Sequence, residues 1–115
     1  MTTIAIDYTA GDTLVMAFEV RHKSTGRPIS LSGASARWSI APIINARTLG
    51  TTALTLTSTD GEITFSGNTA TVTLENGTFT DVGAYKHELE IVLSTGESLT
   101  VASGPFTSAQ AINTD

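Results

Sequence analysis

The chain contains no cysteine. Neither a disulfide framework nor a thiolate metal site can therefore form. With 115 residues the chain has the length of one domain and is too short for two ordinary ones. A chain of this size buries enough surface for a single core to hold the fold without cross-links.

Positive charge is scarce. Six Lys and Arg stand against eleven Asp and Glu, a formal net charge of −5, and the cations are scattered apart from a small group between Arg21 and Arg27. Nucleic-acid binding needs a basic surface that releases counterions from phosphates. No apolar run approaches the length of a membrane span, and the start "MTTIAIDYTAGD" lacks the features of a signal peptide. We therefore expect no nucleic acid or membrane partner, and assembly in the cytoplasm.

What the chain does contain favours strands. Hydrophobic residues make up 40% and charged residues 15%, which is too apolar for a disordered chain. Thr and Ser are abundant and Gly numbers ten, a composition typical of strands joined by tight turns. The composition predicts an all-β protein.

Apolar and polar residues alternate along most of the chain, as in "LVMAFEV", "ARWSI", "TATVTLE" and "AYKHELEIVL". A period of two is typical of strands with one buried face. The dipeptides Asp60-Gly61, Gly67-Asn68 and Thr95-Gly96 each separate two such runs and predict hairpins. We expect a β-sandwich or barrel of about seven to nine antiparallel strands over residues 1–107. Its expected core includes Phe18, Trp38, Leu89 and Ile91.

A short corner motif refines this expectation. Asp81, Gly83 and Tyr85 precede the longest alternating run. In immunoglobulin-like (Ig-like) sandwiches a Tyr at this place hydrogen-bonds to the corner between the sheets, and a core Trp lies on an earlier strand, as Trp38 does here. We predict an Ig-like sandwich, with the alternative that Tyr85 is merely a half-buried strand aromatic. His87 stands where antibody domains often have Cys, which departs from the antibody type.

The polar residues form no convincing catalytic or metal-binding pattern. His22 and His87 lack a second ligand at metal spacing, and we expect His87 to be partly buried. Glu88 and Glu90, about 7 Å apart on one strand face, have a separation that could suit a glycosidase, but Lys86 on the same polar face favours a solvated surface. The stretch "STDGE" offers too few oxygen ligands for a calcium loop. We predict no enzyme activity and no catalytic, cofactor or metal residues.

Two segments depart from the alternation. Residues 41–52 contain Ile43, Ile44 and Leu49, which either cap one end of the core or form a contact surface. Residues 108–115 are expected to form a flexible or partner-ordered tail. Together with the expected N-terminal edge strand these segments supply the candidate interface residues, namely Thr2, Ile4, Ile6, Ile43, Ile44, Leu49, Ala111 and Ile112.

Four stretches in order, "AGDTLVMAFEV", "TGRPISLSGASARWSI", "STDGEITFSGNTATVTL" and "VGAYKHELEIVLSTGESLTVASGPF", carry a family resemblance. The chain resembles small bacteriophage virion proteins with an Ig-like sandwich, similar to the N-terminal domains of baseplate and tail-fibre proteins. The resemblance implies a structural, non-enzymatic role in the tail, baseplate or head–tail region of the virion. It also implies contacts with other virion proteins, several symmetric copies and no cofactor.

Two alternatives remain. A capsid decoration protein would use the same chemistry elsewhere in the particle. A carbohydrate-binding or host-adhesion module would need exposed aromatics, and Tyr8 and Phe79 are the two that alternation does not place in the core. If the tail is a docking arm, deleting residues 108–115 should abolish incorporation into the particle and leave the melting temperature nearly unchanged.

Overall fold

The computed structural model describes residues 2–22, 24–45 and 48–110, in which it has ten strands and no helix. The strands are β1 (Thr2–Thr3), β2 (Ile6–Thr9), β3 (Leu14–Glu19), β4 (Ser35–Asn45), β5 (Thr48–Leu49), β6 (Leu54–Thr57), β7 (Ile63–Ser66), β8 (Thr69–Leu74), β9 (Gly83–Val92) and β10 (Ser98–Ala109). The prediction of an all-β protein is confirmed.

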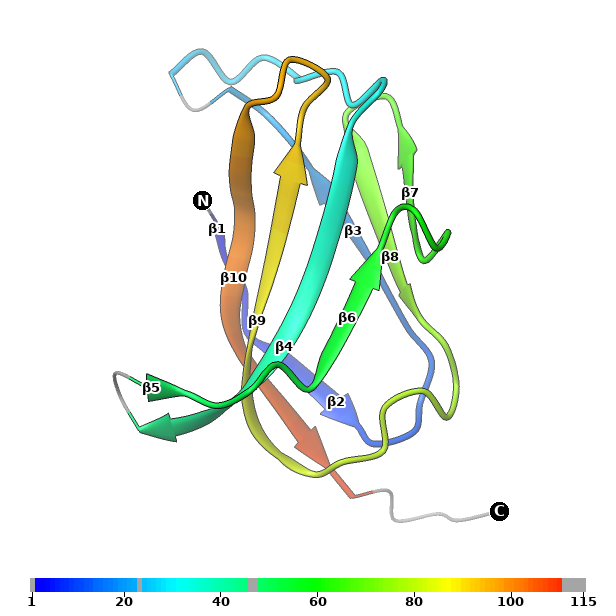
Figure 1. Cartoon of the computed structure of the whole chain (residues 1–115), viewed down its shortest axis with the longest axis vertical. Coiled ribbons are helices and arrows are strands. Elements are labelled where there is room, and N and C mark those ends of the chain that lie inside the picture. The colour runs from blue at the N-terminus through cyan, green and yellow to red at the C-terminus, as the bar shows by residue number, and fades with distance from the viewer. Residues whose placement is uncertain (1, 23, 46–47, 111–115) are drawn as a thin grey trace.

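The strands form two sheets that face each other (Figure 1). In the larger sheet β10, β9 and β4 lie side by side, with β1 and β2 paired to the outer edge of β10 and with β5 and β6 paired to β4. The smaller sheet has the order β3-β8-β7. The chain therefore forms a two-layered fold in which the core lies between the sheets.

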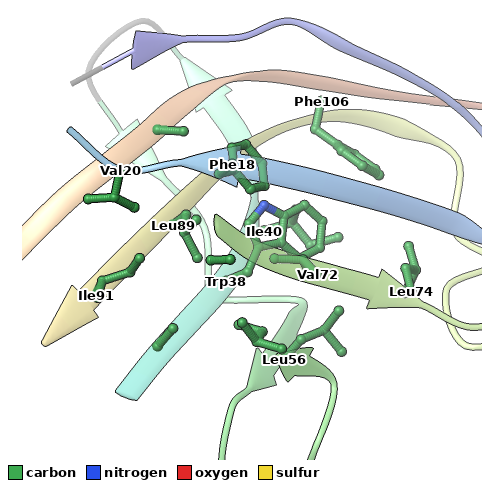
Figure 2. Close-up of a cluster of buried hydrophobic side chains, with 14 of the residues drawn as sticks. Phe18, Val20, Trp38, Ile40, Leu56, Val72, Leu74, Leu89, Ile91 and Phe106 are labelled. Atoms are coloured by element: carbon green, nitrogen blue, oxygen red, sulfur yellow. The ribbon is translucent and has the colours of Figure 1, made fainter. Parts of the chain in front are cut away.

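The alternating residues fill the space between the two layers, as Figure 2 shows. Trp38, Leu89 and Ile91 are fully buried and Phe18 is almost so, which confirms all four predicted core residues. On β3 the opposite face is exposed, including Val15. Burying one large apolar side chain stabilises a fold by about 1.5–3 kcal/mol, so this inner face supplies most of the driving force.

The N-terminal strands run parallel to their partner, which the sequence did not predict. Thr2 of β1 pairs with Ala102 of β10, and Ile6 of β2 pairs with Phe106 of β10. Both pairings are parallel. The expectation of purely antiparallel strands is therefore wrong for β1 and β2. Alternation tells which side chains face the core, and it carries no information about which strand is the partner or which way it runs.

The predicted turns differ in what they connect. Gly67-Asn68 and Thr95-Gly96 join β7 to β8 and β9 to β10 as hairpins, as predicted. Asp60-Gly61 instead lies between β6 of the larger sheet and β7 of the smaller one. The hairpin prediction there is wrong, because turn residues allow a reversal without fixing the sheet that the chain enters next.

The last strand extends further than expected. β10 continues through Ser108 to Ala109, which pair with Tyr8 and Thr9 of β2. The Ser108 side chain is buried, and its hydroxyl donates to the Asp81 carbonyl at 2.6 Å. The boundary predicted at residue 107 therefore cuts through a strand. Ala111 and Ile112 lie outside the described residues.

Candidate functional site

The most distinctive surface feature is a hairpin that continues beyond the larger sheet; we call its described residues, 43–45 and 48–49, the arm. β4 pairs with β9 as far as Pro42, opposite Tyr85, and then goes on to Asn45 with only β5 beside it. Ile43 pairs with Leu49, and the Gly50 N–H donates to the Pro42 carbonyl at 2.8 Å. Figure 1 shows this hairpin projecting from one end of the sheet.

The arm carries aliphatic side chains into solvent. Ile44 is 65% exposed, Leu49 46% and Ile43 42%. None of the three belongs to the core or to the half-buried residues packed on it. Of the two explanations open at the sequence level, capping of the core is therefore wrong. The described residues of this segment form a short two-stranded hairpin with an apolar surface.

The N-terminal edge exposes less apolar surface for an interface than the sequence predicted. Ile4 and Ile6 are half-buried and pack against the core, so their side chains are not available as interface residues. The side chains of Thr3, Ala5 and Asp7 are the exposed ones on this edge. The prediction that Ile4 and Ile6 form an interface is therefore wrong. A partner at this edge would contact the strand backbone and the exposed side chains named above.

A buried histidine fastens this edge. Trp38 Nε1–H donates to His87 Nδ1 at 3.3 Å, and His87 Nε2 lies 2.7 Å from the Ile4 carbonyl oxygen. Because an indole can only donate, Nδ1 must accept, and the proton resides on Nε2, which donates to Ile4. Burial lowers the pKa of His87, and the hydrogen bond to Ile4 opposes this shift in part. The imidazole is therefore a neutral structural link between β9 and the N-terminal segment.

Gly104 makes room for the same contact. It lies in β10 opposite His87, has φ of +154°, and a Cβ on it would overlap the Ile4 carbonyl oxygen. The close approach of the Ile4 backbone therefore requires glycine. Sequence reasoning missed this role, although a glycine inside the alternating run "TVASGPF" is the usual signal of a close backbone approach.

The predicted corner is held by a different group. The Tyr85 phenol has no hydrogen-bond partner among the described residues, and the Asp81 carbonyl accepts from Ser108 instead. The Tyr85 ring packs edge-on against Phe79, with ring centroids 5.3 Å apart. Gly83 begins β9 beside that ring. The hydrogen bond expected from Tyr85 is therefore not formed.

The two aromatics proposed for sugar stacking lie inside the protein. Tyr8 and Phe79 are each 4% exposed. The Tyr8 hydroxyl donates to the Asp12 carbonyl at 2.6 Å, while its ring packs against Phe106. The sequence placed both outside the core because neither lies in a strongly alternating run. A carbohydrate-binding site built on these rings is excluded by their burial.

A groove lies between the two sheets at the end opposite the arm. It has a volume of about 530 Å³ and is lined partly by the half-buried aliphatic side chains of Ile29, Leu93, Leu99 and Val101. Glu97 and Thr100 are exposed on its rim. The groove was not predicted from the sequence, because the loop that carries Ile29 has no strand periodicity.

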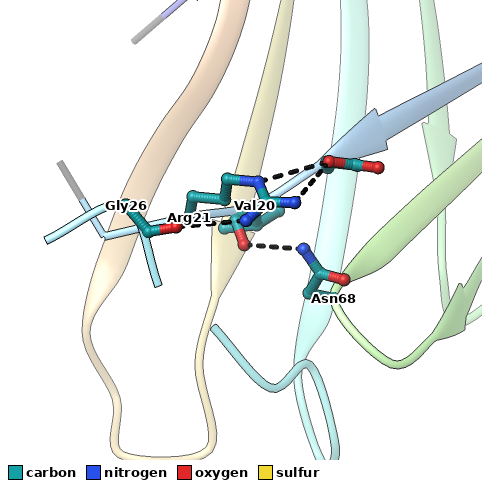
Figure 3. A network of polar contacts seen from close by, with 5 residues as sticks. Val20, Arg21, Gly26 and Asn68 are labelled. Atoms are coloured by element: carbon teal, nitrogen blue, oxygen red, sulfur yellow. Dashed lines mark hydrogen bonds and ion pairs between the residues drawn. The ribbon is translucent and has the colours of Figure 1, made fainter. Parts of the chain in front are cut away.

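Val20 and Arg21 line one side of the groove. Figure 3 shows the polar contacts that they make. Arg21 forms an ion pair with Glu19 at 3.1 Å and donates to the Gly26 carbonyl at 3.1 Å. Asn68 donates from its side-chain amide to the Val20 carbonyl at 3.2 Å. Exposed ion pairs of this kind contribute about 0–1 kcal/mol, so their effect here is to orient the turn.

The carboxylates singled out by the sequence lie on the outer face of the larger sheet. Glu90 pairs with Arg37 at 3.3 Å, and both line a shallow hollow together with Glu88 and Lys86. Within residues 2–22, 24–45 and 48–110, no three His, Asp or Glu side chains form a metal-binding group. In the same residues no helix is long and apolar enough to span a membrane.

Comparisons with known proteins add only distant structural likeness. No protein-family model matches the chain, and no curated protein matches it. One similar structure is the PmoD soluble domain from Methylocystis sp. (Rockwell), with 17% identity and a TM-score of 0.49 over 90% of this chain and 77% of that one. Another is a family 123 glycoside hydrolase from Clostridium perfringens, with 14% identity and a TM-score of 0.42 over 99% of this chain and 24% of that chain. Likeness at this level carries no argument about function.

Proposed function

We propose that the chain is a non-enzymatic structural protein of a bacteriophage particle, which works through protein–protein contacts in a symmetric assembly. The observation that carries this proposal is the arm, because Ile43, Ile44 and Leu49 project apolar surface from one end of the sheet. Grouped exposed aliphatics of this kind mark interaction sites. The setting in a virion is supported by the family resemblance of the four sequence stretches.

The strand order supports the finer proposal of an Ig-like sandwich. In such folds strands B, E and D share one sheet, and strands C, F and G share the other. Here β3, β8 and β7 occupy the first set of places, and β4, β9 and β10 the second. Trp38 lies on β4, the counterpart of the strand that carries the core Trp. His87 occupies the place of the antibody cysteine and contacts Trp38 through a hydrogen bond.

The test is the composition of purified particles, measured by quantitative mass spectrometry. We expect the chain in particles at a small multiple of six copies if it belongs to the tail, baseplate or head–tail region. A copy number in the hundreds would favour the capsid decoration alternative. Absence from the particles would refute the proposal.

A variant pair then tests whether the arm is the contact. Ile44→Ser with Leu49→Ser should remove the chain from particles, because assembly would no longer bury these side chains. The matched control is Val15→Ser, which changes a residue that is 60% exposed on β3, in the other sheet. Equal incorporation of both variants would show that the arm is not the docking surface.

A further inference from the structure

We infer that the arm of one copy binds the groove of the next, so that copies of this chain associate head to tail. This inference rests on the proposed function and names the partner of the arm. It starts from the match between the two surfaces. The arm exposes three aliphatic side chains, Ile43, Ile44 and Leu49, and the groove is lined partly by aliphatic side chains such as Leu99 and Val101.

The backbone of the groove is suited to an extended segment. β10 has β9 along one side, while on its other side β1 begins pairing only at Ala102. Between Ser98 and Val101 the outer edge of β10 therefore has no strand partner among the described residues. Free strand edges bind extended segments of other chains by main-chain hydrogen bonds, with side chains entering adjacent pockets. The arm is itself an extended two-stranded segment.

Opposite charges lie at the base of the arm and on the rim of the groove. Lys86 lies at the base of the arm, next to Ala41 of β4. The groove lining contains one cation, Arg21, which is paired with Glu19, so its uncompensated charge is that of Glu97, which is exposed and has no ion-pair partner in the described part of the chain. Complementary charges of this kind favour one register of docking and disfavour contact of arm with arm.

The geometry makes the contact intermolecular. The arm leaves the larger sheet at the end where Pro42 pairs with Tyr85, whereas the groove lies at the end where Ser35 pairs with Val92. Seven residues of extended strand separate these ends, which corresponds to ~23 Å. An arm therefore cannot reach the groove of its own copy. Contacts between different patches of identical copies generate rings or open filaments, as a symmetric assembly requires.

Disulfide cross-linking tests this inference. Because the chain has no cysteine, single thiols can be introduced without competing native ones. Ile44→Cys places a thiol on the arm and Thr100→Cys places one on the groove rim. Mixing the two full-length variants under mild oxidation should give a disulfide-linked heterodimer. The control mixture is Ile44→Cys with Thr64→Cys, an exposed position on β7. Disulfide formation with Thr100→Cys should be about tenfold faster than in the control, because docking raises the effective concentration of one thiol near the other. Non-reducing electrophoresis with mass spectrometry identifies the products.

Each other outcome has a definite meaning. Equal rates with Thr100→Cys and Thr64→Cys would overturn the inference. Faster self-linking of Ile44→Cys would also overturn it, because arms would then meet arms. If cross-linking fails while the arm variant is still lost from particles, the proposed function stands and only the choice of partner is wrong. If cross-linking succeeds while particles lack the chain, the head-to-tail contact stands and the virion role fails. All three thiol positions are exposed, and circular dichroism of each variant verifies the fold.

Discussion

At the scale of single residues, His87 combines full burial with two satisfied ring nitrogens. Its place on the inner face was indicated by the alternation of "AYKHELEIVL", and the burial is complete where the sequence predicted a partly buried histidine. Its partners were not predictable, because Ile4 is 83 residues away and its carbonyl reaches the ring through a parallel pairing. A lone histidine in a strand pattern thus indicates burial but does not identify its partner.

The buried imidazole predicts a pH dependence of stability. In the unfolded chain a histidine takes up a proton below a pH of about 6.5. In the folded chain burial lowers the pKa of His87, because the charged imidazolium would lose its hydration, while the hydrogen bond to Ile4 opposes this shift in part. The unfolded state therefore binds more protons between the lowered pKa and pH 6.5, and the free energy of unfolding falls as the pH falls through this window, by up to about 1.4 kcal/mol per pH unit.

Urea unfolding of the wild type and of His87→Gln across this pH range measures the effect. The difference between the two curves should grow at higher pH and shrink as the pH falls, since only the wild type has the buried imidazole. His22→Gln is the control, because His22 is exposed and should leave the curve unchanged. A constant offset between wild type and His87→Gln would contradict the prediction.

Gly104 gives a second prediction at this scale. Gly104→Ala should lower the free energy of unfolding by at least about 1–3 kcal/mol, because the new methyl group displaces the Ile4 backbone from β10. Gly83→Ala is the matched control, since Gly83 has a similar φ of +149° but its Cβ would meet only the Tyr85 ring at 3.6 Å. Denaturant titration of both variants separates overlap from backbone strain. Equal losses would argue against the close contact at Ile4.

At the scale of elements, β10 pairs with more strands than the sequence predicted. It pairs with β9 on one side and with both β1 and β2 on the other. The sequence predicted the hairpin with β9 from Thr95-Gly96, because a tight turn fixes its own neighbours. The pairing with β1 and β2 has no local signal. The end of β10 was assigned to a tail for the same reason, since "SAQAINTD" has Ile112 as its single large apolar residue and shows no alternation.

Two truncations distinguish the strand from the segment after it. Deleting residues 108–115 should lower the melting temperature by several degrees, because it removes the Ser108 hydrogen bond to Asp81 and two pairs with β2, worth at least about 1 kcal/mol. Deleting residues 110–115 keeps these contacts and should leave the melting temperature unchanged. This replaces the expectation from sequence that the longer deletion leaves the melting temperature nearly unchanged. Equal melting temperatures for the two truncations, by calorimetry, would contradict it.

At the scale of the whole molecule, the sequence predicted the class of fold and the core better than the surface. Phe18, Trp38, Leu89 and Ile91 were identified because burial on one face of a strand leaves a period of two. The absence of that period in residues 41–52 left two positions open for Ile43, Ile44 and Leu49, against the core or on a contact surface. The groove was not predictable, because it depends on how far apart the two sheets lie at one end, which no local pattern encodes.

The parallel pairing of Thr2 with Ala102 also bears on how the chain reaches its native state. The first strand cannot find its place until β10 has been synthesised, and closing so long a loop is entropically slow. During translation the side chains of Ile6 and Tyr8 therefore stay exposed to solvent until β10 has been synthesised. In this interval the nascent chain is exposed to aggregation through these side chains.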